Sequence, residues 1–112
     1  MSIVTHKQII PGVELTASLA TYHTATFGKT KISRITFTNT DTVVRTVTVH
    51  YVPNAGSADD TNIVCNQFPI GPLKSIAPYF LEGHILENGD FIRMEADVTE
   101  KVTVVGSGME IV

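Results

Sequence analysis

The stretch that decides the fold runs from Lys31 to Pro53 and reads KISRITFTNTDTVVRTVTVHYVP. It holds two runs rich in Val, Ile and Thr, separated by the polar break Asn39-Thr40-Asp41-Thr42. β-Branched side chains pack well on a pleated, half-buried surface, whereas Asn, Thr and Asp side chains bond to their own backbone in turns. The stretch therefore predicts an antiparallel strand pair, with a strand over residues 31–38 and its hairpin partner over 43–52.

The second of these strands alternates between two kinds of side chain. Successive residues of a strand point to opposite faces of the sheet, so every second residue shares a face. The apolar face consists of Val47, Val49 and Tyr51. The polar face consists of Thr46, Thr48 and His50. We expect the apolar face in the core and the polar face as an outward stripe that can contact a neighbouring molecule.

The rest of the chain is divided into short segments by turn residues. Residues 3–10 end at Pro11-Gly12, a strong turn dipeptide, and form either a first strand or, with the rest of 1–12, an N-terminal arm outside the domain. Asn88-Gly89 predicts a type I′ hairpin loop, because this dipeptide readily adopts positive φ angles. The remaining expected elements are a single helical turn within 80–86 and strands over 18–24, 62–68, 73–77, 90–96 and 101–112.

This pattern of about seven or eight short strands with no long helix predicts an all-β fold, an antiparallel β-sandwich or jelly roll. The 112 residues fit one domain over 1–112 with a single core. Gly106 and Gly108 lie within the last expected strand, where they mark a bulge or a close backbone approach.

Composition argues for a folded domain with few charges. Hydrophobic residues make up 43% and charged residues 17%, and the net charge of −3 leaves no basic stripe for a nucleic-acid backbone. The one cysteine, Cys65, excludes an intrachain disulfide and fits a small core residue. No secretory signal or apolar run of about 20 residues is present, so we expect no membrane contact and synthesis in a cytoplasm.

No catalytic motif is recognisable. The four histidines, His6, His23, His50 and His84, form no His-x-His pair, and the Asp59-Asp60 loop lacks the spacing of an EF-hand. We therefore expect no enzyme activity, no metal and no cofactor. Convergence of His23, His50 and a carboxylate in space stays open, and it would indicate a metal enzyme of the cupin type.

Three segments together resemble the small β-sandwich structural proteins of tailed-phage virions. They are residues 35–41 (ITFTNTD), 45–49 (RTVTV) and 86–92 (LENGDFI). The resemblance covers about the last ninety residues and consists of strands and turns rather than a diagnostic motif. It implies a non-enzymatic virion protein, of which capsid decoration or cement proteins are one type. Such a protein binds between capsomers and stabilises the shell.

The leading hypothesis from the sequence is a capsid decoration protein located in the virion. Its expected partners are the major capsid protein or another virion protein and further copies of itself, as a dimer or trimer. The alternative is a receptor- or carbohydrate-binding module of a phage tail or fibre. The candidate contact residues are Ile3, His6, Thr46, Thr48, His50, Asn54, Asp59 and Asp60.

Overall fold

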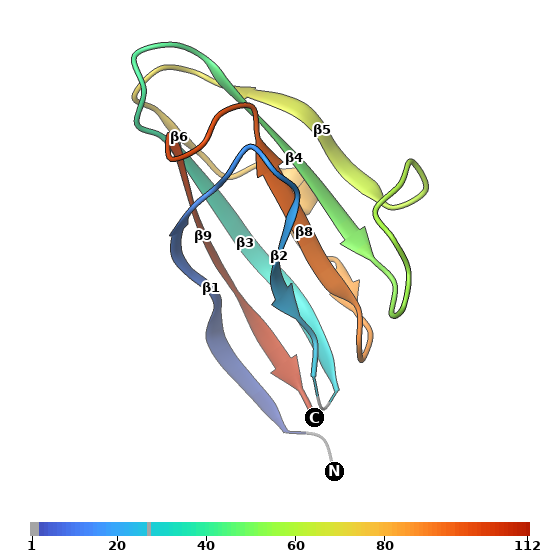
Figure 1. Cartoon of the computed structure of the whole chain (residues 1–112). Helices are drawn as coiled ribbons and strands as arrows, with labels where there is room; N and C mark the ends of the chain where they lie inside the picture. The colour runs from blue at the N-terminus through green and yellow to red at the C-terminus, as the bar shows by residue number, and fades with distance from the viewer. Residues whose placement is uncertain (1–2, 27) are drawn as a thin grey trace.

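Two antiparallel sheets pack face to face in the computed structural model, which describes residues 3–26 and 28–112 (Figure 1). The strands are β1 (Val4–Glu14), β2 (Ala20–Thr24), β3 (Lys29–Asn39), β4 (Arg45–Val52), β5 (Ile63–Ile70), β6 (Ser75–Ile76), β7 (Ile85–Leu86), β8 (Phe91–Ala96) and β9 (Val102–Ile111). A short 3₁₀ helix, η1 (Tyr79–Leu81), lies between β6 and β7.

The strand order defines a jelly roll. In the first sheet the order is β1-β9-β3, and the short strands β6 and β7 both pair with the other side of β3. The second sheet has the order β2-β8-β4-β5. The chain crosses repeatedly from one sheet to the other, so most neighbours in sequence are not neighbours in a sheet. The predicted all-β antiparallel sandwich or jelly roll is confirmed.

The predicted hairpin between residues 31–38 and 43–52 is wrong. The two segments are strands, but β3 lies in the first sheet and β4 in the second, and the chain between them turns a corner. Asn39 is fully buried at this corner, and its side-chain Nδ2 donates to the carbonyl oxygens of Val43 (2.8 Å) and Ile70 (3.0 Å). These bonds direct the chain across the sandwich instead of back along β3.

The turn at Asn88-Gly89 is present, but it is not a type I′ hairpin loop. It joins β7 of the first sheet to β8 of the second. Asp90 N–H donates to the carbonyl oxygen of Glu87 (2.9 Å), and only Gly89 of the two central residues has a positive φ, of 91°. A positive φ at the third residue alone is the mark of a type II turn.

The N-terminal strand passes through Pro11 without ending there. β1 pairs with β9 from Val4 to Glu14, with irregular register on both sides of Ile10. Because proline is tolerated on edge strands and at bulges, Pro11 does not interrupt the strand, and the expected turn at Pro11-Gly12 is wrong. Of the alternatives for residues 1–12, residues 4–12 form a strand of the sheet, and residues 1–2 lie outside the described residues.

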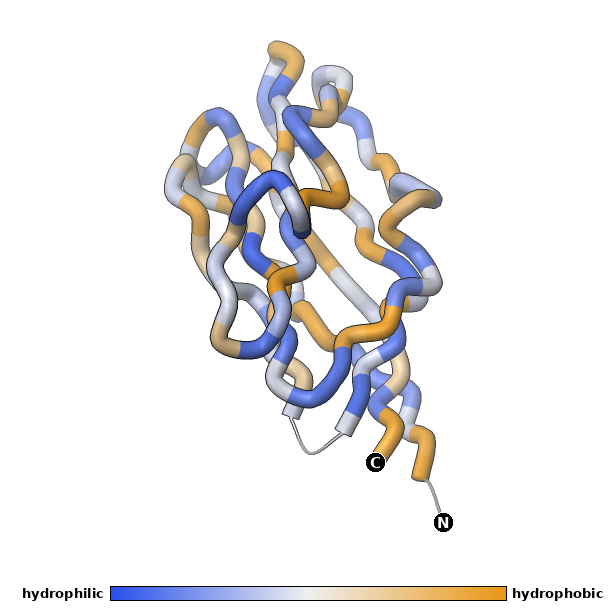
Figure 2. Tube along the Cα trace, turned by 90° about the vertical axis from the view of Figure 1, so that its right-hand side faces the viewer, coloured by the Kyte–Doolittle hydropathy of each residue, from blue (hydrophilic) through white to orange (hydrophobic). Residues whose placement is uncertain are grey.

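Apolar side chains from both sheets fill the space between them, and Figure 2 shows apolar and polar residues alternating along the strands. The largest fully buried side chains are Phe37, Ile10, Leu15, Ile32, Ile35, Ile70, Leu81, Leu86, Ile92, Met94, Val47 and Val49. Cys65 is buried in β5 as predicted, and burial raises the pKa of its thiol to about 11.

Gly106 and Gly108 fulfil both expectations made for them. The register with β1 shifts between Gln8 and Ile10, opposite Gly106, and a Cβ on Gly106 would lie 3.2–3.3 Å from the Ile10 side chain. A Cβ on Gly108 would collide with the carbonyl oxygen of Lys31. The glycines therefore allow β1 and β3 to approach β9 closely from its two sides.

Candidate interaction surfaces

The N-terminal contact residues lie at one edge of the first sheet. Ile3 precedes β1 and is 63% exposed, and His6 lies exposed within β1. Ile3 N–H donates to the carbonyl oxygen of Val112 (2.8 Å), and Val112 N–H donates back to Ile3 (2.9 Å). Ile3 and Val112 therefore lie side by side at one end of the sandwich, where Figure 1 shows β1 beginning and β9 ending.

The predicted outward stripe on β4 is mostly covered. Thr46 is half-buried, but Thr48 and His50 are only 9% and 8% exposed, so the expected exposure is wrong at these two positions. Beside Thr48, β5 has a bulge, in which the two residues Asn66 and Gln67 lie opposite Thr48 alone, between the residues that pair with Val47 and Val49. Gln67 adopts a φ of 49° and its N–H donates to Thr48 Oγ1 (3.1 Å).

The loop between β4 and β5 is organised by Asn62. Its Oδ1 accepts hydrogen bonds from His50 Nδ1 (2.9 Å) and Asp59 N–H (3.1 Å), and its Nδ2 donates to the Ser57 carbonyl (2.8 Å). The exposed Asp59 carboxylate accepts from Thr61 N–H (2.8 Å) and Oγ1 (2.5 Å). These two bonds from Thr61 lower the pKa of Asp59. Two predicted contact residues, His50 and Asp59, are thus brought together through Asn62.

The other predicted residues of this loop are separate from that cluster. Asp60 is exposed within the loop, and Asn54 is exposed beside the turn that precedes β8. The Asn54 N–H donates to Asp90 Oδ1 (2.9 Å). The structure therefore distributes the eight candidate residues over the β1 edge, the outer side of β4 and the 53–62 loop, rather than into one site.

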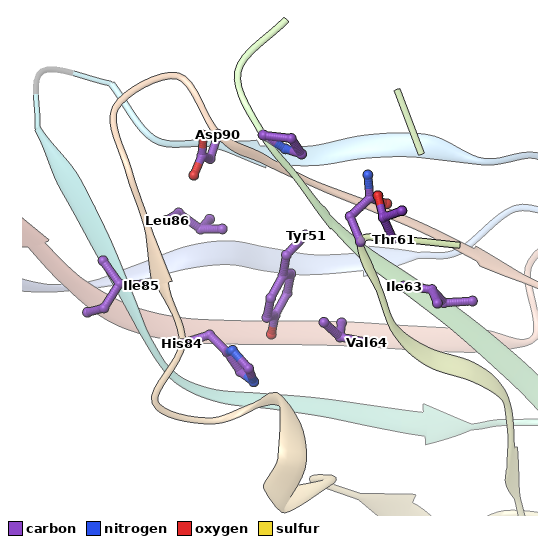
Figure 3. A pocket seen from close by; sticks show the side chains of 10 residues that line it. Tyr51, Thr61, Ile63, Val64, His84, Ile85, Leu86 and Asp90 are labelled. Atoms are coloured by element: carbon purple, nitrogen blue, oxygen red, sulfur yellow. The ribbon is translucent and has the colours of Figure 1, made fainter. Parts of the chain in front are cut away.

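A pocket of about 350 Å³ opens between β4, the start of β5 and β7 (Figure 3). The residues that line it are Tyr51, Pro53, Thr61, Asn62, Ile63, Val64, His84, Ile85, Leu86 and Asp90. Tyr51 and His84 meet edge to face with ring centroids 5.2 Å apart. The Tyr51 hydroxyl donates to the Leu81 carbonyl (2.8 Å), and burial raises the pKa of Tyr51. Much of the polar lining is therefore already bonded within the fold.

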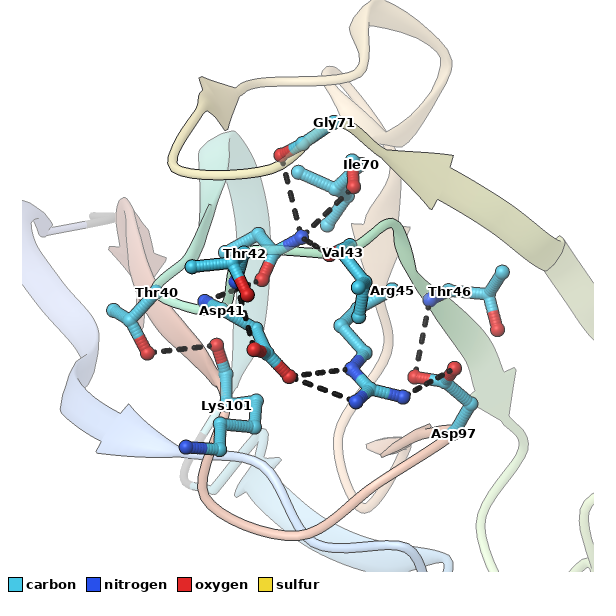
Figure 4. Close-up of polar contacts among 11 residues, drawn as sticks. Thr40, Asp41, Thr42, Val43, Arg45, Thr46, Ile70, Gly71, Asp97 and Lys101 are labelled. Atoms are coloured by element: carbon cyan, nitrogen blue, oxygen red, sulfur yellow. Dashed lines mark hydrogen bonds and ion pairs between the residues drawn. The ribbon is translucent and has the colours of Figure 1, made fainter.

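An ion-pair cluster closes the opposite end of the sandwich (Figure 4). Arg45 Nη2 and Nε both bind Asp41 Oδ2, at 2.7 and 3.0 Å, and Nη1 lies 3.5 Å from Asp97 Oδ2. The hydrogen bonds from Arg45 are the main reason that the pKa of Asp41 is lowered. Thr42 N–H also donates to Asp41 Oδ1 (2.7 Å). This cluster joins the β3–β4 corner to the end of β8.

The histidines do not converge on a metal. His23 lies on the inner face of the second sheet and is hydrogen-bonded to Thr30 Oγ1 (3.1 Å), and burial lowers its pKa. His50 lies on the outer face of the same sheet. Among residues 3–26 and 28–112, no three His, Cys, Asp or Glu side chains are grouped to hold a metal ion. Within the same residues, no helix is long and apolar enough to cross a membrane.

The sequence did not indicate the two most exposed large apolar side chains of the described residues. Leu73 is 69% exposed in the Gly71-Pro72-Leu73-Lys74 turn, at the position where its φ of 57° would favour glycine. Tyr79, at the start of η1, is 82% exposed. The expected strand over 73–77 is shorter in the structure, where β6 spans Ser75–Ile76, and no signal in the sequence showed that Leu73 would lie exposed in the turn before it.

Comparison with known proteins identifies the fold but no family. No family model matches the chain, and no curated protein matches it. A chain of the Bacillus endospore appendages, described as a family of disulfide-linked pili, superposes with a TM-score of 0.57. The superposition covers 97% of this chain and 88% of that one, at 7% sequence identity. This likeness shows that the two chains share a fold.

Weaker matches involve a virus. A chain of infectious bursal disease virus Gx strain matches 99% of this chain and 31% of its own length, with 11% identity and a TM-score of 0.43. For the Gt strain the identity is 14% and the TM-score 0.34. The sheet topology and the superposition on the pilus chain define the fold class, a small β-sandwich of jelly-roll topology.

Proposed function

We propose that this chain is a non-enzymatic structural protein of a virion and that it decorates the capsid by binding between capsomers. The observation that carries the proposal is the outer face of the first sheet. Inner-face residues of β9, such as Val102 and Val104, are buried, so the alternate residues point outward. The central strip of this outer face consists of Thr36, Thr38, Thr103, Val105 and Ser107.

This strip has the chemistry of a protein-contact surface. The neighbouring strands pair Thr36 with Val105 and Thr38 with Thr103, so these neutral side chains are adjacent. Charged residues lie only at the margins of the strip, where Arg34 pairs with Ser107 and Glu14 pairs with Thr103. Val105 lies at its centre and is 40% exposed. A neutral surface can be covered by a partner without the cost of removing charges from water, and charged residues are depleted in interface cores. Many such contacts on one shell would reinforce each other.

The shared fold supports the same reading. The similar endospore appendage chain belongs to a pilus, an assembly of many copies, although that assembly is described as disulfide-linked. Here the single cysteine is buried in β5, and its raised pKa disfavours the reactive thiolate. Assembly through the folded domain would therefore be non-covalent.

The test is binding to undecorated capsids of the virus that encodes the chain. Wild-type protein should co-sediment with the capsids saturably and raise the temperature at which they break open. Val105→Arg, which places a charge at the centre of the strip, should reduce binding at least about tenfold. The matched control is Thr21→Arg, at an exposed position on the second sheet, which should bind as the wild type does. If the wild type does not bind, the capsid role is wrong.

A receptor- or carbohydrate-binding role has one feature in its favour, the pocket beside Tyr51. Its polar groups are largely engaged, since the two Asp90 carboxylate oxygens accept from Asn54 N–H and Glu87 N–H. Few groups are then left to recognise sugar hydroxyls, which favours the structural role. A glycan array separates the two, because specific glycan binding that is lost in Tyr51→Ala would support the alternative.

A further inference from the structure

The first half of β1 is an edge strand whose outer backbone groups can be assigned from the hydrogen-bond pattern. Ile3 and Val112 exchange both of their backbone hydrogen bonds. In an antiparallel pair, hydrogen-bonded and non-hydrogen-bonded residue pairs alternate. The register runs without a shift from Val4 opposite Ile111 to Gln8 opposite Ser107. Thr5 and Lys7 therefore bond to β9.

The alternate residues of this segment are left without backbone partners. Val4, His6 and Gln8 point their N–H and C=O groups away from β9. Within the part of the chain that the structure describes, no hydrogen bond reaches these groups from any other element. All three residues are exposed, and Figure 1 shows β1 on the outer side of its sheet. Residues 4–8 thus present a regular strand edge whose outer backbone groups are unpaired.

The other edges of the two sheets are protected against pairing. β2 has five residues and a register shift between Thr21 and His23. β5 contains two register shifts and Pro69. β6 and β7 have two residues each. The second half of β1 is itself irregular around Ile10 and contains Pro11.

Bulges, prolines and short length are the devices by which proteins prevent edge-to-edge pairing. Their absence from residues 4–8, and their presence on the neighbouring edges, marks this segment as the one suited to accept a strand. Lys7 is the one residue of the segment whose charge could oppose pairing. Its Nζ forms an ion pair with Glu110 Oε1 (3.2 Å) on the inner face of the sheet. The charge therefore does not lie along the strand edge, where it could repel a second strand.

We propose that residues 4–8 of β1 pair antiparallel with the same residues of a second copy, which joins two first sheets into one continuous sheet. The two-fold axis lies at His6, so that His6 faces its own counterpart and Val4 faces Gln8 of the second copy. Each of these three pairs exchanges two hydrogen bonds, and every free group of the segment gains a partner. A two-fold axis makes an interface self-complementary, as this register is.

This dimer is independent of which larger assembly the chain enters. Because β1 lies at the edge of the sheet, pairing there leaves the central strip around Val105 free in both copies. The dimer would present two such strips on one extended sheet, so each dimer could make two contacts with a shell. The inference therefore adds a self-association site to the proposed function and does not depend on it.

The test is the mass of the purified chain in solution, measured by sedimentation over a concentration series that extends to the millimolar range. Wild-type protein should reach twice 12.2 kDa. His6→Pro removes an N–H that β9 does not use, and proline fits an edge strand, so the fold should survive. The variant should dimerise at least about tenfold more weakly, since two interface hydrogen bonds are lost. His6→Ala keeps the N–H and should dimerise as the wild type does.

A cross-link gives an independent readout of the register. Cα atoms of a hydrogen-bonded antiparallel pair lie about 5.5 Å apart, which a disulfide can span. His6→Cys should therefore form a disulfide-linked dimer under mild oxidation, whereas the exposed control Val105→Cys should not. A monomeric wild type, an unchanged dimer in His6→Pro, or no cross-link in His6→Cys would each overturn the inference. If a monomer still binds capsids and His6→Pro abolishes that binding, the edge pairs with a strand of the capsid instead, and the decoration role stands.

Discussion

At the β3–β4 corner, the polar groups around Asn39 are saturated with bonds, whereas residues 4–8 at the free edge of the same sheet leave a row of backbone groups unbonded. Asn39 Nδ2 is shared among the carbonyls of Val43, Ile70 and Gly71, and its Oδ1 accepts from Asp41 N–H. The difference separates two tasks. The buried corner holds the two sheets together, while the exposed edge keeps its bonding capacity for a partner.

The largest effect on the free energy of unfolding should come from removing the Asn39 side chain at the corner. Asn39→Ala removes the donor from three carbonyls and the acceptor from Asp41 N–H, and buried polar groups without partners are costly. We expect a loss of about 3 kcal/mol in the free energy of unfolding, measured by urea denaturation. The control Asn66→Ala, at an exposed position of β5, should change it by less than about 0.5 kcal/mol. Equal stability of the two variants would contradict the role assigned to the corner.

The corner also shows why the sequence predicted the strands but not their pairing. Alternating side chains are a local signal, and they placed β3 and β4 within a few residues of their observed bounds. The polar break at Asn39 signals a change of direction, but not whether the chain folds back or crosses over. That choice depends on Ile70 and Gly71, about thirty residues away, whose carbonyls Asn39 binds.

The exposure of the candidate contact residues was equally hard to predict from local sequence. Alternation correctly placed Thr48 and His50 on the face opposite Val47 and Val49, but it could not show that their side chains bond to residues outside β4. Thr48 Oγ1 accepts from Gln67, whose left-handed backbone has no turn signal in the sequence, and His50 bonds to Asn62 in the 53–62 loop. The edge position of β1 was likewise hidden, because strand order is a property of the whole topology. Pro11, which is tolerated on edge strands, was the one local indication.

The second prediction concerns the strand that supports the free edge. Gly108 pairs with Lys7 on one side and allows Lys31 to approach closely on the other. Gly108→Ala forces β3 and β9 apart, and we expect a loss of about 2 kcal/mol in thermal or urea unfolding. Gly12→Ala is the matched control, because its added Cβ meets only Val105 Cγ2, at 3.9 Å. It should be neutral or stabilising by less than about 1 kcal/mol.

The variants Gly108→Ala and Asn39→Ala together test whether the corner and the free edge have separate tasks. If Gly108→Ala weakens self-association as well as folding, while Asn39→Ala weakens folding alone, the two regions have separate tasks. Self-association should be measured at a temperature where both variants are folded. Equal loss of self-association in both variants would mean that self-association depends on the overall stability of the domain rather than on the edge itself.

The smallest effect is the pH dependence of the charged part of the corner. The pKa of Asp41 is lowered in the folded protein, chiefly by its hydrogen bonds from Arg45. A carboxyl group with a lowered folded pKa stabilises the protein above its unfolded pKa, which is about 4, and this contribution is lost as the pH falls through the folded value. Wild-type stability should therefore decrease on acidification from about pH 5 to pH 2.

Arg45→Ala should reduce that decrease, because it removes the main cause of the Asp41 shift. Asp59, whose pKa is lowered by Thr61, should contribute equally in both proteins, so the difference between their pH profiles isolates the corner. The control is Arg34→Ala, whose exposed pair with Glu82 is 3.6 Å long and should leave the profile unchanged, since such pairs are worth little. Urea unfolding across this pH range measures the effect. An unchanged profile in Arg45→Ala would mean that the corner relies on the neutral bonds of Asn39 rather than on its charges.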